Sequence, residues 1–330
     1  MAVKSIKDIA RLSGFSVSTV SRVLNNTGRF SDQTRDKILK IAKENHYSQN
    51  IIAKGMRKGS LAIIGILVPD ITNAYYAAIV KKCEQYFFEK DYLTIVCNTE
   101  RNAEIEEKYI AKLSNHIVDG LVVISTQRAI SKNRADLPTV FIDRSPKLSN
   151  NTITASSDNY AGAVIAANHL VDRGCYPIML TNKNNEFSSN KSRILGFTQT
   201  VKSRGINKPI IINSKTNSDE IYLVKDKIFK QIKKLLKEHQ KLGIFAINDN
   251  VASYIYQAAI GEGIRVPEQL SIVGFDDTPV ASKLQLTTIR QNTSEIARVS
   301  STNLLKILKR EDILEHKFTI PVSLVKRKTT

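Results

Sequence analysis

The stretch SIKDIARLSGFSVSTVSRVLN, residues 5–25, combines helix caps with apolar residues at helical spacing. Ser5, with Asp8 three positions later, predicts a capping box at the start of a first helix. Gly14 interrupts the apolar pattern, and Ser16 predicts the N-cap of a second helix. Two short helices that are joined by a tight, glycine-containing turn are typical of a helix-turn-helix unit.

A third helical pattern completes this region. It begins at Ser31 or Asp32, and Ile38 lies on its apolar face. Residues 1–60 carry twelve Lys and Arg side chains against four Asp and Glu, which indicates a polyanionic partner. The charge does not identify the partner, and a membrane surface is the rival to DNA, but lipid-binding helices usually carry large apolar anchors that are missing here. We therefore expect residues 1–47 to form an all-α helix-turn-helix domain that binds DNA.

From Leu61 onward, short apolar runs alternate with amphipathic segments. Continuous apolar strands separated by helices indicate parallel sheets that are covered on both faces. About 270 residues of this pattern exceed one small sheet and predict two doubly wound lobes with a cleft between them. The main apolar runs are LAIIGILV (61–68), YLTIVC (92–97), GLVVI (120–124), PIMLT (177–181), PIIIN (209–213), GIFAI (243–247) and LSIVGF (270–275).

Composition argues against several classes of protein. The 330 residues are 42% hydrophobic and 24% charged, with a net charge of +18, which suits a folded protein with a large core. No apolar run approaches the roughly 20 residues of a membrane-spanning helix, and the first twenty residues lack a signal-peptide pattern, so we expect a cytoplasmic protein. Cys83, Cys97 and Cys175 lack metal-ligand spacing, so we expect no disulfide framework, metal site or cofactor.

In combination, these segments resemble the lactose-repressor family of bacterial transcription regulators. The resemblance runs from one end of the chain to the other in the order of the family. The strings that carry it are SIKDIARLSGFSVSTVSRVLN (5–25), TRDKILKIAKENHY (34–47), NIIAKGM (50–56), IIGILVPDITNAYY (63–76), VDGLVVI (118–124), VFIDR (140–144), DNYAGA (158–163), RILGF (193–197), AINDN (246–250), VPEQLSIVGFDD (266–277) and LTTIRQ (286–291).

The resemblance implies a domain order and an assembly. An α/β periplasmic-binding-protein-like core of two doubly wound parallel-sheet lobes would follow the headpiece. Residues 48–60 would form a hinge helix or linker, and residues 61–330 would bind effector and dimerise. The chain would cross between the lobes near 156–160, 288–292 and 317–321. The family implies a homodimer that binds nearly palindromic double-stranded operator DNA and a small effector between the lobes.

By the same resemblance, the second helix reads DNA bases. Val17, Ser18 and Arg22 take the base-reading positions, and Arg22 has the geometry for a bidentate contact to guanine. The alternative is that Ser18 and Arg22 only solvate an exposed helix face. Phosphate contacts are expected from the start of that helix and from neighbouring polar residues. This set is Ser5, Ser16, Thr19, Ser21, Asn25, Arg29 and Thr34.

The linker departs from the pattern of the family. Met56 takes the place of a leucine that enters the minor groove at the operator centre, so we expect Met56 to pry apart a base step there. Gly55 lowers helix stability by about 1 kcal/mol relative to alanine, which predicts a hinge that orders when it binds DNA. The alternative is a flexible linker. The linker residues expected to contact DNA are Asn50, Ala53, Lys54 and Met56.

Effector contacts are expected where polar residues follow strands, because ligands of doubly wound folds bind at the carboxyl ends of strands. By the resemblance, Arg193 stands where the family has its ligand-binding arginine. Asp276, Asn248 and Arg193 form the favoured group, since carboxylate and amide groups bind hydroxyls and a guanidinium binds an oxyanion or a ring oxygen. As alternatives, Asp276 could be a turn residue, Asn248 an N-cap, and Arg193 part of a solvated face. The full set is Asn73, Tyr76, Asp143, Ser189, Arg193, Lys215, Asn248 and Asp276.

The predicted function is repression of carbohydrate-utilisation genes under control of a sugar-like effector. Lys183, Lys191 and Lys215 lie close in sequence to the predicted cleft, which favours an acidic or phosphorylated sugar. Control by a phosphocarrier protein and a secreted sugar-binding protein remain alternatives. An enzyme is disfavoured, because GxxxxGK, GxGxxG and GxSxG motifs are missing from the sequence. No heptad-rich tail follows Arg327, so a dimer is expected rather than a tetramer.

Overall fold

The computed structural model describes residues 5–47, 60–115, 117–124, 137–143, 153–183 and 187–330. The chain divides into two units, Met1–Leu61 and Ala62–Thr330. Each unit has its own apolar core. Within the described residues, no helix is long and apolar enough to cross a bilayer.

The first unit, called the headpiece here, contains helices α1 (Ile6–Ser13), α2 (Val17–Leu24) and α3 (Asp32–Glu44). Its core is built from one face of each helix, with Ile9, Val20 and Ile38 fully buried. The predicted capping box is confirmed, because the Ser5 N–H donates to Asp8 Oδ2 at 3.1 Å and the Asp8 N–H donates to Ser5 Oγ at 3.3 Å.

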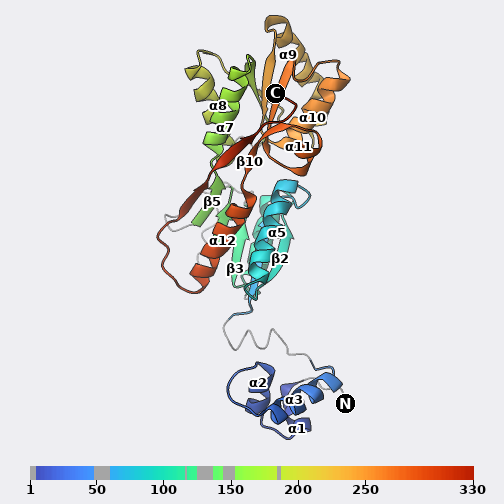
Figure 1. Cartoon of the computed structure of the whole chain (residues 1–330), viewed down its shortest axis with the longest axis vertical. Coiled ribbons are helices and arrows are strands. Elements are labelled where there is room, and N and C mark those ends of the chain that lie inside the picture. The colour runs from blue at the N-terminus through green and yellow to red at the C-terminus, as the bar shows by residue number, and fades with distance from the viewer. Residues whose placement is uncertain (1–4, 48–59, 116, 125–136, 144–152, 184–186) are drawn as a thin grey trace. The chain divides into compact units, whose positions relative to one another are not determined.

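The second unit contains two six-stranded sheets, which define an N-lobe and a C-lobe (Figure 1). The N-lobe order is β11-β5-β4-β3-β1-β2, and all its pairs are parallel. Its strands are β1 (Ile63–Val68), β2 (Leu93–Asn98), β3 (Gly120–Val123), β4 (Thr139–Ile142), β5 (Ile153–Ser157) and β11 (Lys317–Ile320).

The C-lobe sheet has the order β12-β10-β9-β8-β6-β7. It is parallel except at its edge, where β12 pairs antiparallel with β10, and it agrees with the predicted doubly wound parallel lobe. Its strands are β6 (Tyr176–Thr181), β7 (Ile210–Asn213), β8 (Leu242–Ala246), β9 (Leu270–Asp276), β10 (Thr287–Gln291) and β12 (Val322–Val325).

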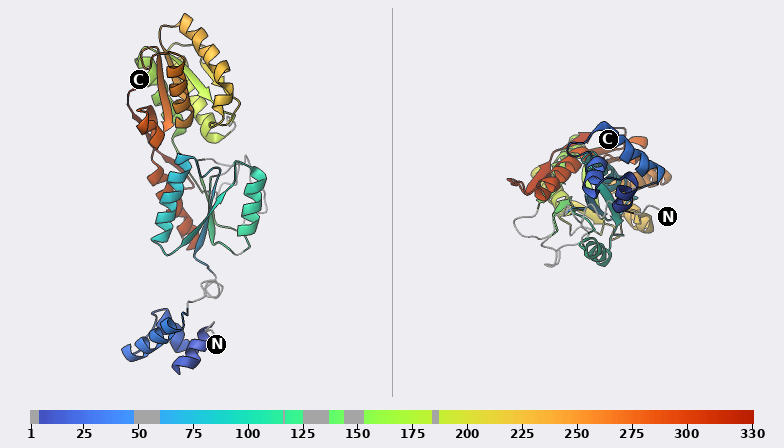
Figure 2. Two further views of the ribbon diagram at one scale, coloured as in Figure 1. Left: turned by 90° about the vertical axis from the view of Figure 1, so that its right-hand side faces the viewer. Right: turned by 90° about the horizontal axis from the view of Figure 1, so that it is seen from below.

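Helices cover both faces of the N-lobe sheet (Figure 2). Ile64 and Ile66 of β1 pack with α5 (Ala74–Phe88) and α12 (Thr293–Leu308), whereas Leu67 packs with α6 (Ala103–Leu113). This alternation explains why the whole strand is apolar, since both of its faces are buried. The helices of the C-lobe are α7 (Asn159–Asp172), α8 (Ser188–Ser203), α9 (Lys225–Glu238), α10 (Asp249–Gly261) and α11 (Pro279–Lys283), with a 3₁₀ turn at Ile221–Val224.

The order of the elements makes the lobes interdependent. The chain leaves the N-lobe sheet after β5, returns from the C-lobe sheet after β10, and passes from β11 of one sheet to β12 of the other. Helix α12 therefore packs on the N-lobe although it follows most of the C-lobe in sequence. The loop that follows β1 in the N-lobe then faces, across one cleft, the loops that follow β6, β8 and β9 in the C-lobe.

Candidate functional site

Helix α2 of the headpiece separates an apolar face from a polar one. The N-cap is Ser16, whose Oγ accepts the Thr19 N–H at 3.1 Å. Val20 and Val23 are buried and form its inner face. The three predicted base-reading residues, Val17, Ser18 and Arg22, are all exposed. The helix therefore presents an apolar group, a hydroxyl and a guanidinium to solvent, as base readout requires.

The predicted phosphate-contact residues fall into two groups. Ser5 and Ser16 are helix N-caps, and Thr19, Ser21, Arg29 and Thr34 are exposed or half-buried. Asn25 instead closes the end of α2, because its Nδ2 donates to the Ser21 carbonyl at 2.7 Å. That bond gives Asn25 a structural role as the C-cap of α2. Among the predicted linker contacts, Asn50, Ala53, Lys54 and Met56 lie outside the described residues.

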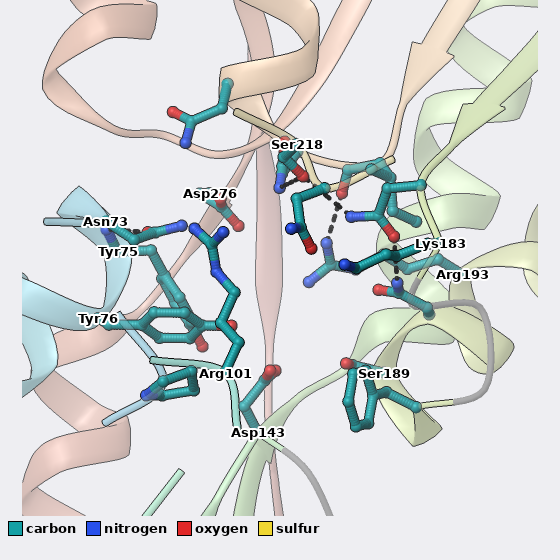
Figure 3. Close-up of a pocket in the computed structure, with 18 residues that line it drawn as sticks. Asn73, Tyr75, Tyr76, Arg101, Asp143, Lys183, Ser189, Arg193, Ser218 and Asp276 are labelled. Carbon is teal, nitrogen blue, oxygen red and sulfur yellow. Dashed lines mark hydrogen bonds between the residues drawn. The ribbon is translucent and has the colours of Figure 1, made fainter. Parts of the chain in front are cut away.

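The cleft of the second unit brings together seven of the eight predicted effector residues (Figure 3). The N-lobe and the C-lobe both contribute to it. Lys215 does not line it, since its exposed side chain lies on the loop after β7, where the Lys215 N–H donates to Asn213 Oδ1 at 2.8 Å. The seven that line the cleft are Asn73, Tyr76, Asp143, Ser189, Arg193, Asn248 and Asp276.

Arg193 is fixed in the floor of the cleft from three directions. Its Nε donates to Asn159 Oδ1 at 2.8 Å, and its Nη1 donates to the Ile247 carbonyl at 2.6 Å. Its guanidinium carbon lies 3.5 Å from the centroid of the Phe275 ring, at stacking distance. Arg193 is 5% exposed, so it does not lie on a solvated helix face. A guanidinium held in this way is preorganised for a ligand oxygen.

Asp276 is the carboxylate at the end of β9. Its Oδ1 accepts a hydrogen bond from Gln291 Nε2 at 2.6 Å. Burial raises the pKa of Asp276 well above its ordinary value, and the positive charge of Arg193 opposes this shift. A polar ligand that donates hydrogen bonds to Asp276 would favour the ionised form, because it would replace lost hydration.

A chain of amide groups lines the C-lobe side of the cleft. Asn190 Nδ2 donates to Asn182 Oδ1 at 3.2 Å, and the Nδ2 groups of Asn182 and Asn248 each donate to Ser218 Oγ at 2.9 Å. Asn248 is also the N-cap of α10, where its Oδ1 accepts the Val251 N–H at 3.0 Å. Asn248 is therefore both a cap and a cleft residue, and the two predicted roles are compatible.

Two buried polar atoms of the cleft lack a hydrogen-bond partner within the described part of the chain. They are the Tyr75 hydroxyl, on a residue that is 5% exposed, and Asn217 Oδ1. Burial raises the pKa of Tyr75 well above its ordinary value, with the charges of Asp143 and Asp276 adding to the effect, so the hydroxyl keeps its proton. One atom therefore offers a donor and the other an acceptor, and a ligand hydroxyl satisfies either.

Sequence reasoning missed the cleft residues that come from irregular loops. Arg101 lies between β2 and α6, and Asn217 and Ser218 lie between β7 and the 3₁₀ turn. Their position in loops that follow β2 and β7 is the available signal in the sequence. Within the described residues, no group of three or more His, Cys, Asp or Glu side chains could hold a metal ion.

The comparisons with known proteins cover both units. Residues 5–50 match the family described as bacterial regulatory proteins, lacI family, and residues 167–330 match the periplasmic binding protein-like domain. The chain is 31% identical to the ribose operon repressor of Halalkalibacterium halodurans, over 99% of this chain and 97% of that protein. It is 32% identical to the sucrose operon repressor of Streptococcus mutans, over 98% of each.

A solved structure extends this agreement to the fold. The structure of the Lac repressor bound to ONPG in the repressed state superposes with a TM-score of 0.82 at 26% identity, covering 99% of both chains. Full-length relatives above 30% identity, a matching headpiece and a matching fold all agree. The chain belongs to the LacI family of bacterial regulatory proteins.

Proposed function

We propose that this protein is a cytoplasmic, homodimeric repressor of carbohydrate-utilisation genes, and that a sugar-like effector in the cleft controls its affinity for operator DNA. The observation that carries the proposal is the convergence of seven predicted effector residues on one cleft, in a chain whose headpiece exposes Val17, Ser18 and Arg22. The ribose and sucrose operon repressors to which the chain is similar favour this function over that of an enzyme or a secreted sugar-binding protein.

The lining of the cleft favours a neutral, hydroxyl-rich effector over an acidic or phosphorylated one. Arg193 shares the cleft with the carboxyl group of Asp276, and Arg101 is bound by the carboxylates of Asp70 and Asp219. Two carboxyl groups, those of Asp143 and Asp276, and one further cationic side chain, that of Lys183, line the same cleft. Most of the remaining polar groups are amides, which both donate to and accept from hydroxyls. The amides are Asn73, Asn182, Asn190, Asn217, Asn248 and Asn250.

The proposed mechanism is a two-state change in the angle between the lobes. An effector that contacts both lobes binds one angle more tightly and shifts the population toward it. In a homodimer, that shift changes the spacing of the two linkers. Release from operator DNA on effector binding is the proposed polarity.

The proposal is tested by a binding screen with the full chain. Labelled intergenic fragments from the native genome are titrated by fluorescence anisotropy at moderate ionic strength, with and without D-ribose, sucrose and their phosphorylated forms. We expect one preferred fragment and a loss of its binding with a neutral sugar. The absence of any preferred fragment under all conditions would contradict the proposed function. If operator binding changes only when a phosphocarrier protein is added, that protein and not a sugar controls the affinity for operator DNA.

Arg22 gives a prediction on base readout. Arg22→Met keeps the length of the side chain but removes the guanidinium, so we expect discrimination between operator and unrelated DNA to fall by about 1–3 kcal/mol. Competition binding on the two DNAs measures this difference. Arg11→Met, which removes an exposed positive charge from α1, is the control for charge alone. Equal losses on both DNAs in Arg22→Met would show that Arg22 contacts only phosphate.

Met56 gives a prediction on DNA bending. If its side chain enters the minor groove, Met56→Ala removes most of the inserted group, and both operator bending and operator affinity should fall. Binding to unrelated DNA should change little, because that binding depends on phosphate contacts. Energy transfer between dyes at the two operator ends reports the bend. An unchanged bend in Met56→Ala would exclude the inserted side chain.

A further inference from the structure

An ion pair joins the two lobes across the cleft. Arg101, which follows β2 of the N-lobe, directs its Nη1 to both carboxylate oxygens of Asp219 in the C-lobe, at 3.0 and 3.1 Å. Its Nη2 donates to Asp70 of its own lobe. Arg101 itself lines the cleft beside Tyr76 (Figure 3). This one guanidinium therefore contacts a carboxylate on each side of the opening.

The C-lobe end of this pair is attached to the amide network of the cleft. Asp219 directly follows Ser218, whose Oγ accepts from the amides of Asn182 and Asn248. The loop is closed on itself, because the Asn217 N–H donates to Glu220 Oε2 at 3.0 Å and the Glu220 N–H donates to the Asn217 carbonyl at 3.2 Å. A displacement of Asp219 would therefore also displace the hydroxyl that orients two cleft amides.

The positive charge of Arg101 and the negative charge of Asp70 are secure at neutral pH. Burial lowers the pKa of Arg101, but the hydrogen bonds and charges of Asp219 and Asp70 outweigh it and raise the pKa overall. Burial also raises the pKa of Asp70, and hydrogen bonds from Thr72 together with the charge of Arg101 outweigh that shift, so its pKa is lowered. Arg101 and Asp70 are therefore ionised, and the guanidinium is shared between the side chains of Asp70 and Asp219.

We propose that the Arg101–Asp219 ion pair holds the two lobes together before the effector binds, and so sets the fraction of chains whose cleft is closed. This inference takes the cleft to be the effector site, as in the proposed function, but the ion pair acts without effector or DNA. Asp70 competes for the same guanidinium from within the N-lobe. Its negative charge therefore limits closure, whereas that of Asp219 promotes it.

The expected size of the effect follows from exposure. The Arg101 side chain is 32% exposed and that of Asp219 is 53% exposed, so solvent screens their attraction. A pair of this kind, in which one guanidinium nitrogen contacts both carboxylate oxygens, changes a two-state ratio by about two- to fivefold. Added salt should lower the ratio of closed to open chains, as loss of the ion pair does, because mobile ions screen exposed charges.

The test measures the distance between the lobes in the full chain without effector or DNA. Spin labels are placed at Lys108→Cys in α6 and Lys227→Cys in α9, both exposed and on different lobes, and singly labelled chains identify distances that arise between chains. The native residues Cys83, Cys97 and Cys175 are buried, which disfavours their labelling. Pulsed electron–electron double resonance then gives the ratio of closed to open chains.

We expect Asp219→Asn to lower the ratio of closed to open chains about two- to fivefold, and 0.5 M NaCl to do the same to the native chain. Asp70→Asn should leave the ratio unchanged or raise it, and its Oδ1 still accepts from Thr72. Asp172→Asn, which breaks the exposed pair with Arg204 inside the C-lobe, is the matched control and should change nothing.

Two results would overturn the proposal. One is an Asp219→Asn distance distribution equal to that of the native chain, and the other is an Asp70→Asn variant that opens as much as Asp219→Asn. The distance measurement uses neither sugar nor operator, so it is independent of the proposed function. If the native chain binds no operator but Asp219→Asn lowers the ratio of closed to open chains, the proposed function is wrong and the proposal on the ion pair is supported. If the native chain binds operator but Asp219→Asn leaves the ratio of closed to open chains unchanged, the proposal on the ion pair is wrong and the proposed function is unaffected.

Discussion

Asp276→Asn is expected to weaken effector binding by about 1.5–3 kcal/mol, which is roughly a ten- to hundredfold loss of affinity, while operator binding without effector is retained. Asparagine keeps the Oδ1 acceptor that receives the Gln291 amide. It also tolerates the backbone of Asp276, whose φ of 121° disfavours most side chains. The change therefore removes the carboxylate from the cleft with little disturbance of the fold.

The physical reason is the loss of a charged acceptor in a buried site. Hydrogen bonds from effector hydroxyls to a carboxylate are stronger than those to an amide, and burial enlarges the difference. An amide also presents a donor where the hydroxyl needs an acceptor. Arg193, which shares the cleft and balances the charge of Asp276, would be left without that balance.

The measurement is a titration of the operator complex with whichever neutral sugar dissociates it in the native chain. Asp277→Asn is the matched control, since the adjacent carboxylate pairs with Arg290 and Arg327 and does not line the cleft. Its effector affinity should stay close to that of the native chain. If the sugar concentration that dissociates half of the operator complex is the same for Asp276→Asn as for the native chain, Asp276 does not contact the effector.

Local patterns predicted the elements of this fold well. The caps at Ser5 and Ser16 were predicted because a hydroxyl before an apolar helix pattern has one strong local use. The buried strands were predicted because a continuous apolar run such as 63–68 suits a strand covered on both faces. Each of these signals depends on neighbours within a few residues.

The cleft was predictable only in part, because its geometry joins segments far apart in the chain. Asn248 and Asp276 follow strand ends and were predicted by the rule for ligands at strand ends, whereas Arg193, which lies in α8, was expected from the resemblance to the lactose-repressor family. The same rule wrongly predicted that Lys215 lines the cleft. The end of a strand determines where the following loop begins, but it does not determine the direction that the loop then takes. The pairing of Arg101 with Asp219 spans 118 positions and has no local signal.

Asp249 shows a further limit of prediction from neighbours. It adjoins Asn248 at the start of α10, yet it does not line the cleft. The fully buried carboxylate accepts from the Thr278 N–H at 2.7 Å, from Thr278 Oγ1 at 2.9 Å and from Thr288 Oγ1 at 2.6 Å. It thereby ties α10 to the loop before α11 and to β10, beside the crossing from β10 to α12.

Asp249→Ala is expected to lower the free energy of unfolding of the second unit by about 3–5 kcal/mol, because three buried donors lose their acceptor and a cavity replaces the carboxylate. Denaturant titration of the full chain, followed by circular dichroism, measures this loss. Asp249→Asn should cost much less, since an amide rotated to place its oxygen toward Thr278 and its nitrogen toward Thr288 satisfies both. A loss below 1 kcal/mol in Asp249→Ala would contradict the role of Asp249 as a buried tie.

The difference in free energy of unfolding between the native chain and Asp249→Asn should depend on pH. Burial raises the pKa of Asp249 to about 6, against the lowering effect of hydrogen bonds from Thr288 and Thr278, whereas an unfolded aspartate titrates near 3.9. The folded chain therefore holds this proton more tightly, so its stabilising contribution is complete below about pH 4 and is lost as the pH rises through about 6. Asparagine has no such proton, and the stability of the native chain relative to Asp249→Asn should fall between pH 4 and pH 6. A constant difference across that window would show that the folded carboxyl titrates as an ordinary aspartate, held ionised by its three donors.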